Sequence, residues 1–162
     1  MNTLELEGFL RRMLPPRVYT GVFAENELPY KELTYPAAII VNTQPSSQRG
    51  DHWVSVYLAK NEPAQFFDTR GQPPEPPVRR FIRIVSPRGL VYNERQVQSR
   101  YTDLCGAFCL DYLYHRHYSP NVSYQRLITE LYPYKDRWRN DVTVHKRFER
   151  LFGVRLNVNK MK

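Results

Sequence analysis

The chain has only two cysteines, Cys105 and Cys109, and it lacks the usual marks of secreted and membrane proteins. Cysteines four residues apart lie on the same side of a helix and cannot form a disulfide framework, so we expect a reducing environment. The N-terminus combines acidic residues with an amphipathic pattern and does not resemble a secretory signal. No run approaches the roughly 20 apolar residues of a membrane span. We therefore expect a protein that is not secreted and has no membrane partner.

The sequence also lacks internal repeats and any long run of basic residues. Its 162 residues are enough for one ordinary core, which predicts a single domain spanning 1–162. The net charge of +8 is spread over small groups of arginine and lysine. Such a charge makes polyanions, nucleic acid above all, candidate partners, but it is equally typical of a solvated basic surface. The sequence does not identify which basic residues would contact nucleic acid.

Short apolar runs bounded by turn-forming residues predict a small sheet. Three such runs follow one another in the first half of the chain, and a fourth comes later. The stretch 70–80, "RGQPPEPPVRR", has four prolines and predicts an extended surface loop. The predicted strands lie within 35–43 ("YPAAIIVNT"), 52–59 ("HWVSVYLA"), 64–69 ("AQFFDT") and 89–93 ("GLVYN").

Helical spacing of apolar residues predicts four helices. The first covers about 3–13 and is ended by two prolines, and its apolar residues are Leu6, Phe9, Leu10 and Met13. The run 105–118 is apolar nearly all round until Arg116, which is typical of a helix buried in the centre of a domain. Two amphipathic segments follow at 123–132 and 143–152, the second with Val144, Phe148, Leu151 and Phe152 on one face. The predicted fold class is α+β.

Cys105 is the first residue of the predicted central helix. A helix N-terminus stabilises a thiolate through its partial positive charge and its free N–H groups. Gly106 removes side-chain bulk beside the sulfur, so a substrate carbonyl could approach closely. Cys109 lies one turn deeper between apolar residues and is interpreted as a buried packing thiol. Taken alone, a cysteine and a glycine at a helix start are more often packing residues than a catalytic pair.

Three polar residues add to this pattern. His52 opens a predicted strand after the polar loop 44–51, and Asp68 closes the next strand, so pairing of these strands would bring the carboxylate to the far nitrogen of the imidazole. A carboxylate there fixes the tautomer of a histidine base. Gln98 precedes Cys105 by seven residues, so its amide and the Cys105 N–H could form an oxyanion hole. Each residue alone has a commoner role at a turn or surface, and it is their combination that indicates chemistry.

The order His, Asp, Gln, Cys-Gly, with Trp53 directly after the histidine, resembles the adenovirus-type cysteine proteases, the adenain family. This family belongs to a wider clan that includes the SUMO- and ubiquitin-like-specific proteases. The segment "VQSRYTDLCGAFC" is similar to the family's "VQGPNSAACGLFC", with no gap between glutamine and cysteine. "YTGVFAENELPY", "IIVNT", "HW" and "FFDT" are similar to the family's "GTYDKRFPGF", "AIVNT", "HW" and "LFEP". The resemblance covers roughly residues 18 to 118.

The resemblance implies a papain-like architecture in which a central helix carries the nucleophile and packs on a small mixed sheet. It implies Cys105 as nucleophile, His52 as base, Asp68 as the orienting acid and Gln98 as oxyanion donor. Trp53 and Gly106 would border a narrow tunnel that admits small substrate residues, commonly glycine. The implied function is a viral or mobile-element endopeptidase that cleaves capsid and core precursors during virion maturation, in the host nucleus and the virion. The chemistry itself requires no cofactor.

Adenovirus proteases are activated by viral DNA and by a short viral peptide, which is tethered through a disulfide to a cysteine between the acid and the glutamine. This chain has no cysteine between Asp68 and Gln98. A disulfide-linked peptide activator is therefore not expected, whereas a non-covalent peptide remains open. DNA as an activator and partner is compatible with the net charge of +8.

Other interpretations stay open at this point. A deconjugating protease for ubiquitin-like proteins would show the same catalytic order. A caspase-like enzyme also has its histidine about 50 residues upstream of the cysteine, but its surrounding signature is absent here. A papain-like order would need a histidine downstream of Cys105; His115, His117 and His145 exist, but the first two lie in the same predicted helix as Cys105 and cannot swing back to it. The non-enzymatic alternative is a basic nucleic-acid-binding domain with an inert Cys105. A metal site is not expected, since Cys105, Cys109 and His115 on one helix lack the spacing of zinc ligands.

Overall fold

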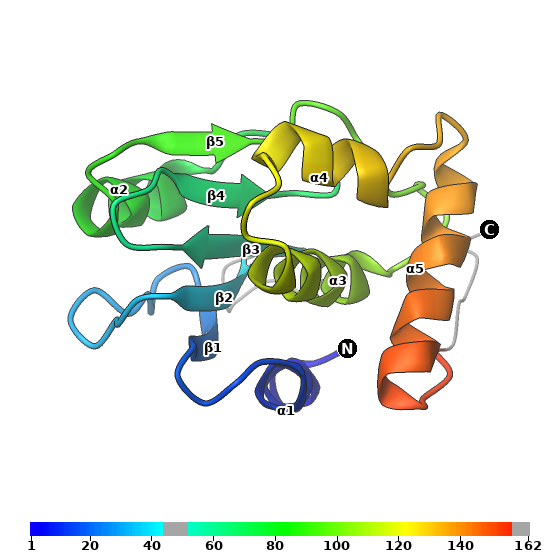
Figure 1. Ribbon diagram of the computed structural model, residues 1–162, viewed down its shortest axis with the longest axis horizontal. Helices are drawn as coiled ribbons and strands as arrows, with labels where there is room; N and C mark the ends of the chain where they lie inside the picture. The colour runs from blue at the N-terminus through cyan, green and yellow to red at the C-terminus, as the bar shows by residue number, and fades with distance from the viewer. Residues whose placement is uncertain (44–51, 157–162) are drawn as a thin grey trace.

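The structure is a computed structural model that describes residues 1–43 and 52–156. Within these residues it has five strands and five helices, which confirms the predicted α+β class (Figure 1). The polar loop predicted at 44–51 lies outside the described residues. No helix in the described ranges is both long and apolar enough to cross a membrane. The strands are β1 (Tyr19–Ala24), β2 (Ala37–Asn42), β3 (Trp53–Leu58), β4 (Ala64–Phe67) and β5 (Leu90–Tyr92), and the helices are α1 (Thr3–Met13), α2 (Pro76–Val85), α3 (Cys105–Tyr118), α4 (Tyr124–Leu131) and α5 (Arg137–Phe152).

The five strands form one mixed sheet in chain order, from β1 at one edge to β5 at the other. The neighbours β2, β3 and β4 are antiparallel, while β1 runs parallel to β2 and β5 runs parallel to β4. The three strands predicted to follow one another therefore lie side by side. In the β3–β4 pair Ser55 lies opposite Phe67, so the first residues of β3 are at the same end of the sheet as the last residues of β4.

Both faces of the sheet are covered, as the side chains of β2 show. Ala38 and Ile40 pack in one apolar core with the helices α1, α3, α4 and α5. The alternate residues Ala37, Ile39 and Val41 pack in a second core with α2. A strand buried on both faces has a continuous apolar sequence, which explains the run "AAIIV". The helix α3 packs along the middle of the sheet over β3, as predicted for the central helix (Figure 1).

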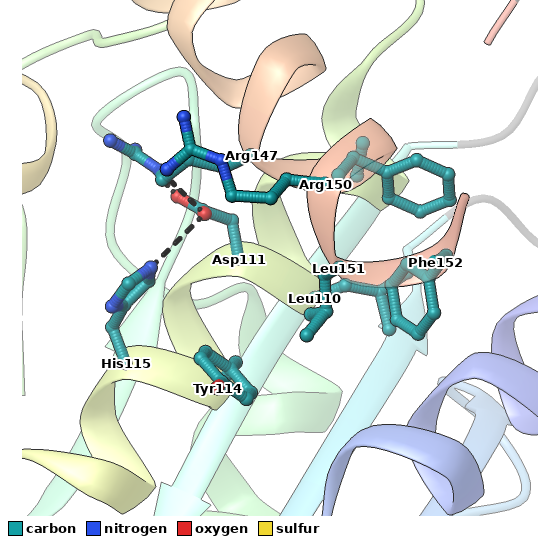
Figure 2. A pocket seen from close by; sticks show the side chains of 10 residues that line it. Leu110, Asp111, Tyr114, His115, Arg147, Arg150, Leu151 and Phe152 are labelled. Atoms are coloured by element: carbon teal, nitrogen blue, oxygen red, sulfur yellow. Dashed lines mark hydrogen bonds and ion pairs between the residues drawn. The ribbon is translucent and has the colours of Figure 1, made fainter. Parts of the chain in front are cut away.

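A buried ion pair joins α3 to α5, the helix at the right of Figure 1. The Asp111 carboxylate accepts from Nε and Nη2 of Arg147, both at 2.8 Å, and His115 lies 3.5 Å from the same carboxylate (Figure 2). Burial raises the pKa of Asp111, but its contacts with His115 and Arg147 outweigh this effect and lower it. Beside the pair lies a cavity of about 200 Å³, walled by Leu110, Phe152 and their neighbours on the two helices. The bidentate pair fixes α5 against α3.

The prediction of an extended loop over 70–80 is wrong from residue 76 onward, where α2 begins with Pro76 and Pro77. Proline is tolerated in the first turn of a helix, because the N–H that it lacks would have no intrahelical partner there. The buried residues Val78, Phe81, Ile82 and Val85 follow at helical spacing and cover the sheet.

Three further details differ from the sequence-based expectations. The last helix, expected over 143–152, already begins at Arg137. The edge strand β1 was not predicted, and most of its residues are only partly buried, so its apolar pattern is weak. Leu151 was expected on the buried face of the last helix, but it is 39% exposed. The other three residues expected on that face, Val144, Phe148 and Phe152, are buried as predicted.

Candidate active site

His52 and Asp68 meet where β3 begins and β4 ends. His52 directly precedes β3 and Asp68 directly follows β4, so the antiparallel pairing places both at one end of the sheet. The Nε2 atom of His52 lies 2.7 Å from Oδ1 of Asp68. Both residues are nearly buried, with 6% and 5% of their surfaces exposed. The predicted contact between the histidine and the carboxylate is therefore present.

Cys105 is the first residue of α3, as the sequence predicted. Its side chain makes a hydrogen bond with the imidazole of His52. Because Nε2 faces Asp68, the nitrogen that remains for the thiol is Nδ1. The residue before the helix, Leu104, gives no side-chain cap, so the N–H groups of the first turn are not consumed by a capping side chain. Cys105 keeps 7% of its surface exposed. The thiol, the imidazole and the carboxylate thus form a continuous row that begins at a helix N-terminus.

The surroundings of His52 favour its charged form. Burial lowers its pKa, but the hydrogen bonds to Asp68 and Cys105 and the charges of these two groups outweigh burial and raise the pKa to about 9. An imidazole with that pKa is protonated at neutral pH. The arrangement is suited to an imidazolium placed between a carboxylate and a thiolate.

A tight turn holds the Asp68 carboxylate toward His52. Its Oδ1 also accepts from the Arg70 N–H at 3.0 Å, and its Oδ2 accepts from the Gln72 N–H at 3.4 Å. Gly71 between them has a φ of +73°, and a Cβ there would lie 2.7 Å from the backbone of Arg95. Only glycine fits both the conformation and the space of this turn.

Asn93 anchors the backbone of Asp68, and sequence reasoning missed it. It directly follows β5, next to β4 in the sheet, and 2% of its surface is exposed. Its Oδ1 accepts from the Asp68 N–H at 3.0 Å, and its Nδ2 donates to the Asp68 carbonyl oxygen at 2.6 Å. The signal in the sequence was an asparagine at a strand end, which is too common at turns to stand out.

Gln98 lies in the segment between β5 and α3 and is also nearly buried, with 7% of its surface exposed. Its amide nitrogen donates to the Thr102 carbonyl oxygen at 3.0 Å and to the Thr102 hydroxyl at 3.2 Å. Its backbone N–H faces the Thr69 carbonyl oxygen at 3.4 Å, just after Asp68. The backbone contact to Thr69 links the segment that contains Gln98 to the turn that follows Asp68. The orientation of the Gln98 side-chain amide is set by Thr102, a residue that the sequence did not single out.

Trp53 and Gly106 lie against each other beside Cys105. Trp53 is 3% exposed, and a Cβ on Gly106 would lie 3.4 Å from its ring and 3.3 Å from Leu6 of α1. Gly106 thus permits close packing between α3, α1 and the start of β3. The substrate-binding role of both residues stays a prediction.

Cys109 has no surface exposed, and burial raises the pKa of its thiol well above the ordinary value. A thiol in such surroundings is held in the neutral, unreactive form. This agrees with its interpretation as a packing residue and separates it from Cys105.

No protein-family model matches this chain, and no curated protein matches its sequence. A crystal structure of the selenomethionine form of the ASFV pS273R protease is similar, with a TM-score of 0.50 and 23% identity, over 67% of this chain and 43% of that protein. A second crystal structure of the same protease gives a TM-score of 0.48 at 22% identity, over 67% of this chain and 42% of that one. The central domain of Lpg1148 from Legionella pneumophila gives 0.49 at 13% identity, over 93% and 98% of the two chains.

The first of these similarities bears on the fold of the chain and not on its activity. The chain spans less than half the length of the ASFV protease that it matches. The shared architecture is the predicted one, a central helix packed on a mixed sheet, as in the papain-like cysteine proteases. The comparison therefore supports the α+β fold class with a central helix packed on a mixed sheet, and it does not identify the adenain family.

Proposed function

We propose that this chain is a cysteine endopeptidase. The observation that carries the proposal is the row of three groups in which Asp68 binds Nε2 of His52 at 2.7 Å and the thiol of Cys105 bonds to the same ring. The row joins the ends of two strands to the first residue of a helix, which is the arrangement of a nucleophile, a base and an orienting acid. The similarity in fold to a viral protease supports the same conclusion.

The proposed reaction follows from the charges of this row. The Cys105 thiolate attacks the carbonyl carbon of the scissile peptide, and a C–S bond forms as the carbonyl oxygen takes the negative charge. The His52 imidazolium gives its proton to the leaving amine as the C–N bond breaks. Water, deprotonated by His52, then attacks the thioester, releases the acid and restores the thiolate. Asp68 holds the ring and stabilises its charged form throughout.

Two donors would stabilise the oxyanion, the Cys105 backbone N–H and the Gln98 amide. The Gln98 amide nitrogen donates to two oxygens of one residue, the carbonyl oxygen and the hydroxyl of Thr102. One N–H shared between them satisfies both, as in a three-centre hydrogen bond. The second N–H of the amide then remains for the substrate oxygen.

The substrates we propose are capsid or core precursors of a virus or virus-like element, cleaved after small residues during virion maturation. The support is the sequence resemblance to adenovirus-type proteases, which implies that Trp53 and Gly106 border a narrow tunnel for small substrate residues. A library of peptides that vary on the acyl side of the cleaved bond tests this directly. Cleavage confined to glycine and other small residues is expected, and equal cleavage after bulky residues would contradict it.

Replacing Gln98 by alanine is expected to lower kcat by about 10² to 10³, because an oxyanion donor acts mainly in the transition state. The measurement is steady-state hydrolysis of the best library peptide by both proteins. KM should change little, since the amide is not required to bind the ground state. Gln125→Ala, an exposed glutamine on α4, is the control, because the Gln96 side chain donates to the Gln98 carbonyl oxygen at 3.0 Å and supports the same segment. An unchanged kcat in Gln98→Ala would remove Gln98 from the oxyanion hole.

A further inference from the structure

Asp141 is a buried carboxylate on α5 that the proposed chemistry does not use, and 1% of its surface is exposed. Its Oδ1 accepts from the Ser99 backbone N–H at 3.0 Å. Its Oδ2 accepts from the Ser99 hydroxyl at 2.5 Å and from the Thr102 hydroxyl at 2.9 Å. Burial raises the pKa of Asp141, and the hydrogen bonds from Ser99 and Thr102 oppose that rise. All of these donors come from the segment that joins β5 to α3.

The Thr102 hydroxyl connects Asp141 to Gln98. A hydroxyl has one hydrogen, and Thr102 donates it to Asp141, so the lone pairs of Oγ1 remain for a donor on the other side. That donor is the Gln98 amide nitrogen, at 3.2 Å from Oγ1 and 3.0 Å from the Thr102 carbonyl oxygen. Both Thr102 oxygens act as acceptors here, so Nε2 of Gln98 faces them and Oε1 does not.

We propose that Asp141 is a positioning residue that holds the Gln98 amide in its oxyanion-binding orientation through the Thr102 hydroxyl. The proposal rests on the proposed function. Two hydrogen bonds connect the Asp141 carboxylate to the Gln98 amide, one to the Thr102 hydroxyl and one from it to Gln98. Asp141 therefore acts through Thr102 and not on a reacting atom. Its neighbour Asn140 supports the same segment, since its Nδ2 donates to the Val97 carbonyl oxygen at 3.0 Å. The α5 helix, fixed to α3 by Arg147 and Asp111, is the rigid base for these contacts.

The substitution Asp141→Asn keeps the shape of the side chain but removes its charge and replaces one acceptor oxygen by a donor NH2 group. The Ser99 N–H needs an acceptor, so the oxygen of the new side-chain amide should stay there and its NH2 should face the two hydroxyls. Thr102 would then accept from this NH2 group and turn its own hydrogen away, toward the Gln98 amide nitrogen. Two donors would face each other, and the amide of Gln98 would lose its fixed orientation.

The kinetic test compares wild type and Asp141→Asn in peptide cleavage and in alkylation of Cys105 by iodoacetamide. Alkylation needs the Cys105–His52 pair but no oxyanion hole. We expect kcat to fall roughly 10- to 100-fold, with KM and the alkylation rate within about twofold of wild type. Asp103→Asn is the matched control, because Asp103 is an exposed carboxylate in the same segment. Equal losses of cleavage and alkylation, or an unchanged kcat, would overturn the proposal.

Variants of Thr102 test the connection itself. Thr102→Ser keeps the hydroxyl and should retain nearly full kcat, whereas Thr102→Val removes it and should lower kcat as Asp141→Asn does. If Asp141 acts through this hydroxyl, Asp141→Asn should add little further loss in the Thr102→Val protein. Fully additive losses in the double variant would contradict the proposed connection.

A readout independent of activity keeps the two proposals distinguishable. The side-chain amide signals of Gln98 in a ¹⁵N spectrum, assigned by their loss in Gln98→Ala, should exchange slowly with solvent in wild type and faster in Asp141→Asn. If the exchange rate of the Gln98 side-chain amide does not change, Asp141 does not position Gln98, whether or not the cleavage rate changes. If exchange responds as expected but wild type neither cleaves peptides nor alkylates rapidly, the positioning contact stands and the protease proposal fails.

Discussion

Replacing Cys105 by alanine is expected to lower the rate of peptide cleavage by about 10⁶, to the background of the assay. In the proposed reaction the thiol is the group that bonds covalently to the substrate, while His52 transfers protons and Asp68 holds the ring. Without it the imidazole and the oxyanion donors have no acyl intermediate to act on. The measurement is hydrolysis of the best library peptide at several enzyme concentrations. Substrate binding should persist, since alanine removes only the sulfur.

Cys109→Ala is the matched control for this substitution. Both cysteines lie in α3 one turn apart, but Cys109 has no exposed surface and burial raises the pKa of its thiol. We expect Cys109→Ala to retain cleavage within a few-fold and to lose some stability from the small void that it leaves. Substantial cleavage by Cys105→Ala would instead favour a non-enzymatic domain contaminated by another protease.

Replacing Asp68 by alanine is expected to lower kcat by about 10⁴, the effect of removing the acid from a triad of nucleophile, base and acid. Without the carboxylate, Nε2 of His52 has no acceptor, so the ring loses its fixed orientation and its charged form is no longer stabilised. The alkaline limb of the pH–rate profile should move down from about 9, because the hydrogen bond and charge of Asp68 raise the pKa of His52.

Asp68→Asn should lower kcat less than Asp68→Ala does, for a reason specific to this turn. Oδ1 of Asp68 accepts from both His52 and Arg70, and only the longer 3.4 Å contact to Gln72 involves Oδ2. An asparagine oxygen can therefore keep both shorter hydrogen bonds, and only the 3.4 Å contact is lost, because the asparagine NH2 and the Gln72 N–H are both donors. Asparagine preserves the ring orientation but loses the charge. Equal losses in both variants would contradict the assigned geometry.

The sequence predicted the centre of the fold because its signals were local and strong. The apolar runs of β2, β3 and β4 and the apolar helix α3 each lie between clear turn residues, and each was found in its predicted place. His52 and Asp68 adjoin strands that are neighbours in the chain. Sequential pairing, the commonest topology, was enough to bring them together.

The remaining parts depend on contacts that sequence patterns do not reveal. The start of α2 was hidden because Pro76 and Pro77 favour a loop unless the following residues are recognised as helical. The orientation of Gln98 depends on Thr102 and on Asp141, which is 39 residues further along the chain than Thr102. A polar network between two segments so distant in sequence has no spacing rule. It becomes visible only once α5 is placed against the segment before α3.

The most direct test of the central claim is the rate of alkylation by iodoacetamide as a function of pH, in wild type, His52→Ala and Cys109→Ala. If Cys105 and His52 form a thiolate–imidazolium pair, alkylation should already be fast well below pH 8.5, the ordinary pKa of a free cysteine. The alkylation rate should change a second time near pH 9, where His52 loses its proton. Cys109→Ala should behave as wild type, and His52→Ala should lose the low-pH reactivity. A single transition at or above pH 8.5 in all three proteins would contradict the catalytic pair.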